Sequence, residues 1–136
     1  MKLDLTSFEF AIKRLEEGLI RHHLDIEDTQ IRDGLIQRFE FTYELAHRTL
    51  KRYLESVAPT PGDIDRMAFQ DLIRTANEQG LLLGEWTDWK HYREMRSRTS
   101  HAYDEQMALQ VVEGIAKFLA EAQHLRDSLR TRIDHA

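Results

Sequence analysis

Cysteine is absent from the chain, whose 136 residues include only 2 proline and 6 glycine residues. The absence of cysteine excludes disulfides, thiolate metal ligands and a cysteine nucleophile, and it is typical of the reducing cytoplasm. The scarcity of proline and glycine favours long helices over a β fold with many turns. The chain also lacks any run near the roughly 18 apolar residues of a membrane helix, and its N-terminus lacks a signal-peptide pattern. We therefore expect a cytoplasmic protein that has no membrane anchor.

The chain has an excess of acidic over basic side chains, 24 against 19, which gives a net charge of −5. This balance argues against a broadly basic surface of the kind that binds nucleic acid, but it is compatible with a local basic site. The length is typical of one domain, and we expect residues 1–136 to form a single helical domain.

Apolar residues recur at steps of three and four along nearly the whole sequence, which indicates amphipathic helices. The segment Pro59–Gly62 is the strongest interruption and predicts a tight turn between helices, and Gly80 is suited to a helix end. A polar stretch over 21–27 predicts a link after the first helix. The expected helices cover approximately residues 7–20, 29–57, 63–79, 85–98 and 104–133.

About five helices in one domain, two of them long, predict an all-α fold, an antiparallel helical bundle. A helix of 29 residues is about 40 Å long at 1.5 Å per residue. A small protomer covers such lengths incompletely, and we expect the leftover apolar surface to be buried in a homodimer.

The segment 90–103 departs most clearly from this pattern, because four basic residues and one acidic residue give it a charge of +3. It also holds Ser97, Thr99 and Ser100, which are poor residues for a helix interior. Arg96 and His101 are five residues apart, so they point about 140° apart on a straight helix. They can share a site only if the helix breaks between them or two chains contribute. The serine and threonine residues predict such a break, with Ser100 as a cap of the last helix.

The side chains of this segment suit chemistry on phosphate. Histidine exchanges a proton near neutral pH, and arginine offers a planar, permanently charged donor fork. His101 as base and Arg96 as phosphorane-stabilising cation form a minimal set for metal-free cleavage of RNA. The Tyr103 phenol would position a phosphate or accept a transferred group. In the alternative interpretation, Arg96 pairs with Glu94 or another carboxylate, and His101 is a partly exposed residue at a helix start.

Two further sets of polar residues have competing interpretations. Glu40 and Glu44 lie four apart on one helix face, where they would either support Arg96 and His101 or pair with Arg38 and Arg48. The seven histidines invite a metal site, but none occurs in an H-E-x-x-H motif and the adjacent pair at 22–23 chelates poorly. We therefore expect no metal and no cofactor. The tryptophans, Trp86 and Trp89, are expected in the core or in the dimer interface.

Two strings resemble a known family. Residues 96–103 read RSRTSHAY, which resembles the R-x4-H-x-Y signature of HEPN-domain proteins, and residues 34–46 read GLIQRFEFTYELA. Together they resemble the branch known as nucleotidyltransferase substrate-binding proteins, over about residues 15–125. The chain departs from that pattern at Ser97, where asparagine is usual, and at His47-Arg48, where Trp-Lys is usual.

The resemblance implies an all-helical dimer whose two motifs meet in a cleft at the interface. It implies a toxin that cleaves RNA without a metal and a cognate minimal nucleotidyltransferase that acts as antitoxin. By this resemblance Arg96 and His101 are catalytic, Ser97, Ser100, Glu40 and Glu44 support them, and Tyr103 is the residue that the transferase AMPylates. Two alternatives remain: a non-catalytic substrate- or nucleotide-binding subunit of a two-component nucleotidyltransferase, and a dimeric scaffold with a vestigial site.

Overall fold

The computed structural model describes residues 3–135, and this part of the chain is helical, without a β-strand. The all-α prediction is therefore confirmed. The elements are α1 (Thr6–Leu24), α2 (Thr29–Val57), α3 (Pro61–Asp65), α4 (Phe69–Glu78), α5 (Trp86–Arg98), the short 3₁₀ helix η1 (Thr99–His101) and α6 (Glu105–Asp134). No helix among the described residues has the length and apolarity needed to cross a membrane.

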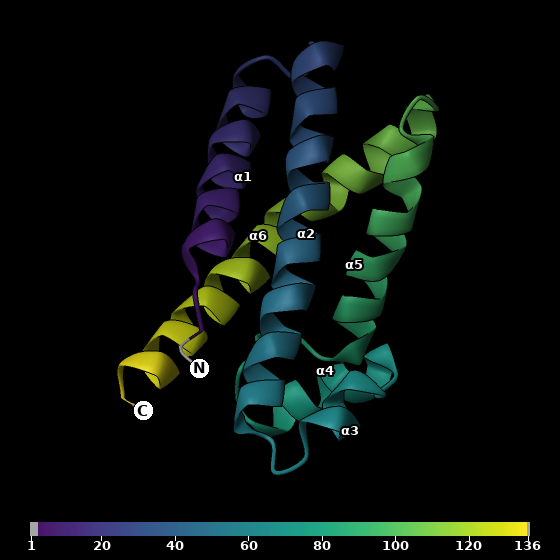
Figure 1. Ribbon diagram of the computed structural model, residues 1–136. Helices are drawn as coiled ribbons and strands as arrows, with labels where there is room; N and C mark the ends of the chain where they lie inside the picture. Colours follow the sequence, from purple (N-terminus) through teal and green to yellow (C-terminus); the bar gives the residue numbers. More distant parts are fainter. Residues whose placement is uncertain (1–2, 136) are drawn as a thin grey trace.

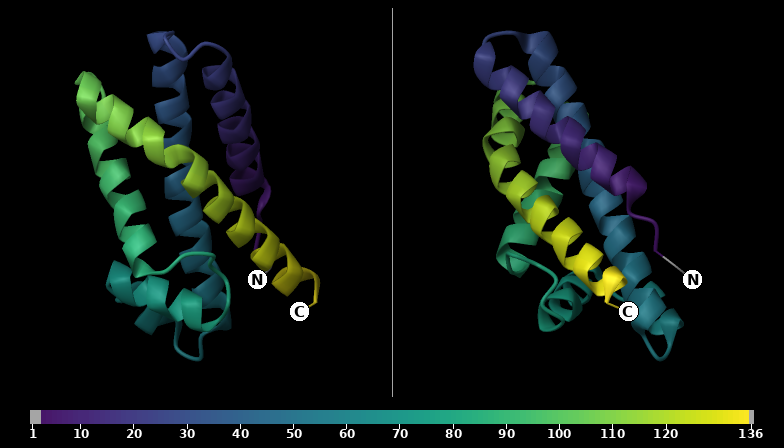
Figure 2. Two further views of the ribbon diagram at one scale, coloured as in Figure 1. Left: turned by 180° about the vertical axis from the view of Figure 1, so that it is seen from behind. Right: turned by 90° about the vertical axis from the view of Figure 1, so that its left-hand side faces the viewer.

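Four helices form an antiparallel bundle, in which α1 and α5 run in one direction and α2 and α6 in the other (Figure 1). The long α6 crosses behind the other three, and it packs on α1, α2 and α5 (Figure 2). The short helices α3 and α4 lie at the end of the bundle where α2 stops (Figure 1). The opposite end carries the turn from α5 through η1 into α6.

The core is centred on aromatic side chains from three helices. The ring of Phe118 on α6 contacts Phe39 of α2 edge to face, with centroids 5.0 Å apart, and Tyr92 of α5 at 5.2 Å. Trp89 is fully buried in the same cluster, which confirms the core prediction for this tryptophan. Trp86 is only half-buried, and its ring packs against Phe69 and the Arg93 guanidinium near the surface. Edge-to-face packing of this kind stabilises beyond the apolar area it buries.

The prediction of one helix over 63–79 is wrong, because the chain turns at residues 66–68 between α3 and α4. Each piece packs on a different neighbour. Ile64 of α3 is buried and the adjacent Asp65 pairs with Lys51 of α2 at 2.8 Å, whereas α4 packs mainly on α5. A single straight helix would not reach both partners. The end of α4 is as expected, since Gly80 adopts a positive φ of 72° that favours glycine.

The predicted link over 21–27 begins too early, because α1 continues to Leu24. The inward face of α1 extends to His22, which is buried, and this packing keeps the polar stretch helical. The link is thus reduced to a few residues before Asp28, whose side chain accepts from the amides of Gln30 and Ile31 and caps α2.

The expected break in the segment 90–103 is present as η1, but the predicted cap is wrong. The cap of α6 is Asp104, whose Oδ1 accepts from the Met107 amide at 3.1 Å. Ser100 instead donates its hydroxyl to the carbonyl of Ser97 at 3.0 Å. A serine inside η1 is too far from the first turn of α6 to cap it. A bidentate pair between Arg32 and Glu105, at 2.7 and 3.1 Å, fastens this first turn to α2.

Candidate functional site

Arg96 lies in the last turn of α5 and reaches across to α2. Its Nε and Nη2 both donate to Oε1 of Glu44, at 3.1 and 2.5 Å, and Oε1 of Glu40 is 3.5 Å from Nη2. The structure thus brings both predicted carboxylates to Arg96. The alternative pairing of these acids is not what the structure shows, because Arg38 donates to the carbonyl of Arg14. Arg96 pairs with Glu40 and Glu44 of α2 rather than with Glu94 of its own helix.

A residue that the sequence interpretation missed, Thr99, fixes the other side of Arg96. Thr99 is buried at the start of η1, and its hydroxyl accepts from Arg96 Nη1 at 3.1 Å. The same hydroxyl donates to the Arg96 carbonyl at 2.7 Å, so it binds both the side chain and the main chain of Arg96. The signal in the sequence is weak, since a threonine three residues after an arginine is common.

The anchoring of Arg96 leaves part of its guanidinium available. A guanidinium has five N–H groups, and three of them donate to Glu44 and Thr99. The other two, one on each terminal nitrogen, form no hydrogen bond with residues 3–135, and the Glu40 carboxylate is in ion-pair range of Nη2 at 3.5 Å. Arg96 is therefore held by protein on part of its planar fork while two donors remain for an oxyanion, an arrangement suited to a phosphate.

His101 and Tyr103 extend outward from the same turn. Their rings are 6.1 Å apart at 68°, and Tyr103 is 87% exposed. His101 is exposed as well. Among the described residues no hydrogen bond or ion pair joins His101 to Arg96. One chain therefore presents the cation and the histidine on the same turn without a hydrogen bond between them in the part of the chain that the structure describes.

The predicted supporting serines have a local role in this structure. Ser97 and Ser100 are both exposed, and the hydrogen bond between them involves the Ser97 carbonyl and the Ser100 hydroxyl. The described structure contains no side-chain hydrogen bond from either of them to Arg96. The two serines shape the turn, and they leave the anchoring of the arginine to Thr99 and Glu44.

A hollow of about 450 Å³ lies between α2 and the turn, directly beside this cluster. Glu40 lines it together with Tyr103, so the second carboxylate near Arg96 and the exposed phenol share one concavity. Its lining residues are Asp33, Gly34, Ile36, Gln37, Glu40, Thr99, Ala102 and Tyr103. Polar side chains from two sides of the hollow can contact one small polar ligand.

The buried phenol beneath the site is not a proton carrier near neutral pH. Tyr43 of α2 lies in the core, and burial raises its pKa to about 12 although Arg93 and Arg96 act in the opposite direction. Tyr43 therefore stays protonated under ordinary conditions.

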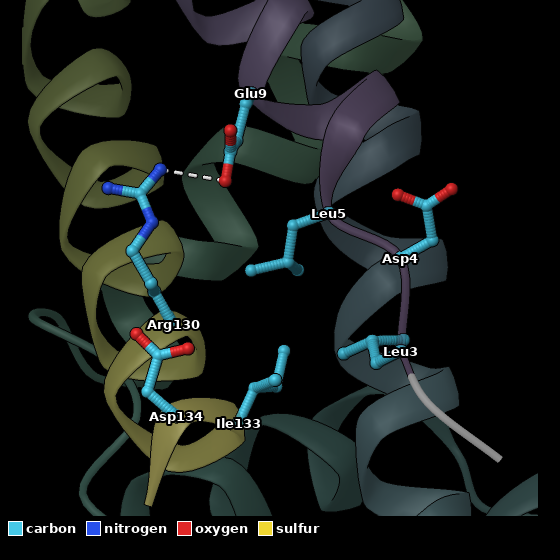
Figure 3. A pocket seen from close by; sticks show the side chains of 7 residues that line it. All are labelled: Leu3, Asp4, Leu5, Glu9, Arg130, Ile133 and Asp134. Atoms are coloured by element: carbon cyan, nitrogen blue, oxygen red, sulfur yellow. Dashed lines mark hydrogen bonds and ion pairs between the residues drawn. The ribbon is translucent and has the colours of Figure 1, made fainter.

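A separate pocket between the start of α1 and the end of α6 lacks these features (Figure 3). Leu3, Leu5 and Ile133 form its apolar wall, and Arg130 at its edge pairs with Glu9 at 2.7 Å. It holds about 410 Å³ but no histidine, and its one arginine is already paired. Over residues 3–135, no three histidine or carboxylate residues are grouped closely enough to hold a metal ion.

The chain is similar to proteins of known sequence and structure along almost its whole length. Residues 3–131 match the family model described as nucleotidyltransferase substrate binding protein like. The chain is 37% identical over 139 residues to the "Probable ribonuclease HepT" of Haemophilus influenzae, covering 96% of this chain and 94% of that protein. It is also similar to a solved Haemophilus influenzae structure described as a nucleotidyltransferase substrate-binding domain. That similarity has a TM-score of 0.87 and 34% identity, and it covers 93% of this chain and 99% of the other.

Proposed function

The chain belongs to the nucleotidyltransferase substrate binding protein like family, and from this premise we propose that it is a HEPN-type toxin, an endoribonuclease that needs no metal. The observation that carries the proposal is the Arg96 cluster. A guanidinium anchored by Glu44 and Thr99, with two N–H donors left over, stands one turn from an exposed histidine. The name of the Haemophilus relative, a probable ribonuclease, supports the same activity.

In the proposed reaction, His101 removes the proton from a ribose 2′-hydroxyl. The 2′-oxygen then attacks the adjacent phosphorus, and the bond to the 5′-oxygen of the next nucleotide breaks. The products are a 2′,3′-cyclic phosphate and a 5′-hydroxyl, whose proton comes from a second acid. Arg96 donates its two remaining N–H groups to the phosphate oxygens, where negative charge increases in the transition state. Glu40 and Glu44 act through Arg96 and are positioning residues.

A homodimer is part of this proposal, because within the described residues of one chain no hydrogen bond joins His101 to Arg96. Two copies related by a two-fold axis would place the histidine of one beside the arginine of the other, and the second histidine would supply the acid. Apolar side chains that remain exposed on the described surface outside the Arg96 site, among them Phe10, Ile20 and Leu109, support an association of copies.

We further propose that a cognate minimal nucleotidyltransferase is the antitoxin and transfers AMP to Tyr103. The phenol oxygen would attack the α-phosphorus of ATP, losing its proton and releasing pyrophosphate. The 87% exposure of Tyr103 makes its oxygen accessible to another protein. AMP attached there would add a bulky anion beside His101 and Arg96, which would exclude RNA from the site.

The decisive test incubates RNA with the purified chain in EDTA, next to the variants Arg96→Ala and His101→Ala. We expect cleavage by the wild type to persist in EDTA and to fall by roughly 10²-fold or more in both variants. Matched controls remove a similar side chain elsewhere. His23→Ala and Arg74→Ala change exposed residues on α1 and α4 and should leave cleavage unchanged. Undiminished cleavage by His101→Ala, or none by the wild type, would overturn the proposal.

A second function is favoured by the hollow beside Tyr103. Its volume of about 450 Å³ and its polar lining fit a small ligand such as a nucleotide. The chain would then be a non-catalytic subunit that presents a substrate to the nucleotidyltransferase. This alternative predicts nucleotide binding and a stable complex without cleavage of RNA. Growth arrest on expression that is relieved by Arg96→Ala favours the ribonuclease and contradicts this alternative.

A further inference from the structure

A groove of about 310 Å³ runs between α1 and α2 and begins at the acid that anchors Arg96. Glu44 belongs to the groove and to the Arg96 site, because it lines the groove and accepts the hydrogen bonds of Arg96. The floor is apolar and includes Phe41, whose side chain is 52% exposed. The complete lining is Ala11, Arg14, Arg38, Phe41, Glu44, Leu45 and Arg48.

The groove has an excess of positive charge that the protein does not neutralise. Among residues 3–135, none of Arg14, Arg38 and Arg48 forms an ion pair with a carboxylate. Glu44, the one acid of the lining, already pairs with Arg96. Three arginines that share one groove without an ion pair repel one another, so their charges do not stabilise the isolated chain. In a chain of net charge −5, such a group indicates an anionic ligand.

The central arginine of the groove is held in a fixed position. Arg38 Nη1 donates to the Arg14 carbonyl at 2.8 Å, which ties α2 to α1. Its stem passes over Gly18, where a Cβ would come within 3.1 Å of Arg38 Cδ. Glycine at this position therefore leaves room for the stem. An arginine restrained in this way loses less entropy when it binds an anion than a freely moving side chain does.

We infer that this groove binds a single-stranded segment of RNA and directs it to Arg96. The three arginines contact phosphates, and the exposed ring of Phe41, between Arg38 and Arg48 on one face of α2, stacks with a base. Charged grooves with aromatic platforms bind single strands in this manner. Arg38 and Arg48 are ten residues apart, or about 15 Å along the helix axis, so the contact covers more than one nucleotide. The inference rests on the proposed ribonuclease function and extends it to the path of the substrate.

Binding and cleavage are measured separately, so that each hypothesis can fail alone. A fluorescein-labelled single-stranded RNA of 20 nucleotides is titrated with the otherwise complete protein carrying His101→Ala, which prevents consumption of the probe. In that background, Arg14→Ser with Arg48→Ser should weaken binding by roughly tenfold per arginine. Phe41→Ser should weaken it as well, by about five- to tenfold. The matched control, Lys13→Ser with Arg74→Ser, removes two exposed cations outside the groove and should bind as tightly as the parent.

The salt dependence gives a second readout that folding defects do not imitate. Each phosphate contact contributes about 0.7 to the slope of log affinity against log salt for a single strand. Loss of two arginines should lower that slope by about 1.4, and the control pair should leave it unchanged. Size-exclusion chromatography with light scattering is run on every variant to measure the mass of the particle.

Three outcomes would overturn the inference. If the groove variants bind RNA with the affinity and salt slope of the parent while the wild type cleaves RNA, the groove is not the path and the ribonuclease proposal stands. If they lose the mass of a dimer instead, the groove is an interface between copies. If the wild type neither binds nor cleaves RNA, both proposals fail.

Discussion

Glu44 offers a sharp test of the idea that this site depends on how Arg96 is held. Glu44→Ala removes the oxygen that accepts from Nε and Nη2, whereas Glu44→Gln keeps an oxygen acceptor and removes only the charge. If the carboxylate positions the guanidinium, the alanine variant should be impaired and the glutamine variant should recover part of the activity. If the carboxylate contributes only to stability, both variants should cleave RNA as the wild type does.

The magnitudes separate the two roles. The side chains of Arg96 and Glu44 are 29% and 47% exposed, so solvent screens the pair and its loss should cost only about 0–1 kcal/mol of unfolding free energy. For a chain of this length, that corresponds to a drop in Tm of at most about 5 °C. A displacement of a catalytic group by about 1 Å lowers a rate by roughly 10²-fold. Activity should therefore fall far more than stability.

The assay compares kcat and KM for cleavage of a short RNA in EDTA with Tm measured for the same preparations. We expect kcat of Glu44→Ala to fall about 10- to 100-fold while KM stays constant or decreases, because an acid has been removed from the path of an anion. Glu44→Gln should retain a kcat within about tenfold of the wild type. A wild-type kcat for Glu44→Ala, or an equal loss in both variants with a large decrease in Tm, would refute the positioning role.

The remaining predictions concern Tyr103 and the buried Glu121. We expect co-expression with the nucleotidyltransferase to increase the mass of the chain by one AMP and Tyr103→Phe to abolish this increase, and an unchanged increase in the variant would place the modification at another residue. Glu121 is 1% exposed and accepts hydrogen bonds from the amides of Leu83 and Gly84, both at 2.7 Å. Glu121→Ala should therefore lower the free energy of unfolding, measured in urea, by about 2–4 kcal/mol. Glu121→Gln should lower it by less. Burial raises the pKa of Glu121 above its ordinary 4.5 despite these hydrogen bonds, so the folded state binds more protons than the unfolded state and stability should fall as pH rises above 4.5. Urea titrations across that range should show the stability of the wild type falling relative to that of Glu121→Gln, because the other titrating groups are common to both proteins.

The long helices were predictable because their ends are encoded locally. The expected bounds of the second helix, 29–57, coincide with α2, where Asp28 supplies the cap and Pro59 follows the end. The turn between α3 and α4 was not predictable, because residues 66–68 contain neither proline nor glycine. It follows from the need of Ile64 and α4 to pack on different helices. That information lies in the tertiary arrangement rather than in the local pattern.

The candidate site, like the fold, combines features that the local sequence predicts with features that depend on the tertiary arrangement. A break between Arg96 and His101 was readable from the serine and threonine residues, since these disfavour a helix interior. The contact of Arg96 with Glu44 joins residues 52 positions apart, and it was readable only as one of two pairings that the charges allow. Thr99 was missed because its role depends on burial, which a polar residue in a predicted turn does not indicate.

The acidic character of the chain and the proposed site for RNA are compatible because the two acids beside the site, Glu40 and Glu44, pair with Arg96. Glu44 uses one oxygen for both of its bonds to Arg96, and Glu40 stands 3.5 Å away, so the free protein stabilises the guanidinium before any phosphate arrives. A phosphate would have no need to displace Glu44, since two N–H groups of Arg96 are still uncommitted. In the groove between α1 and α2 the arginines form no ion pair with the described residues, and we infer that their charge attracts the strand. In this proposal the charge that holds Arg96 is carried by Glu40 and Glu44 of α2, and the charge that collects the substrate is carried by Arg14 of α1 together with Arg38 and Arg48 of α2.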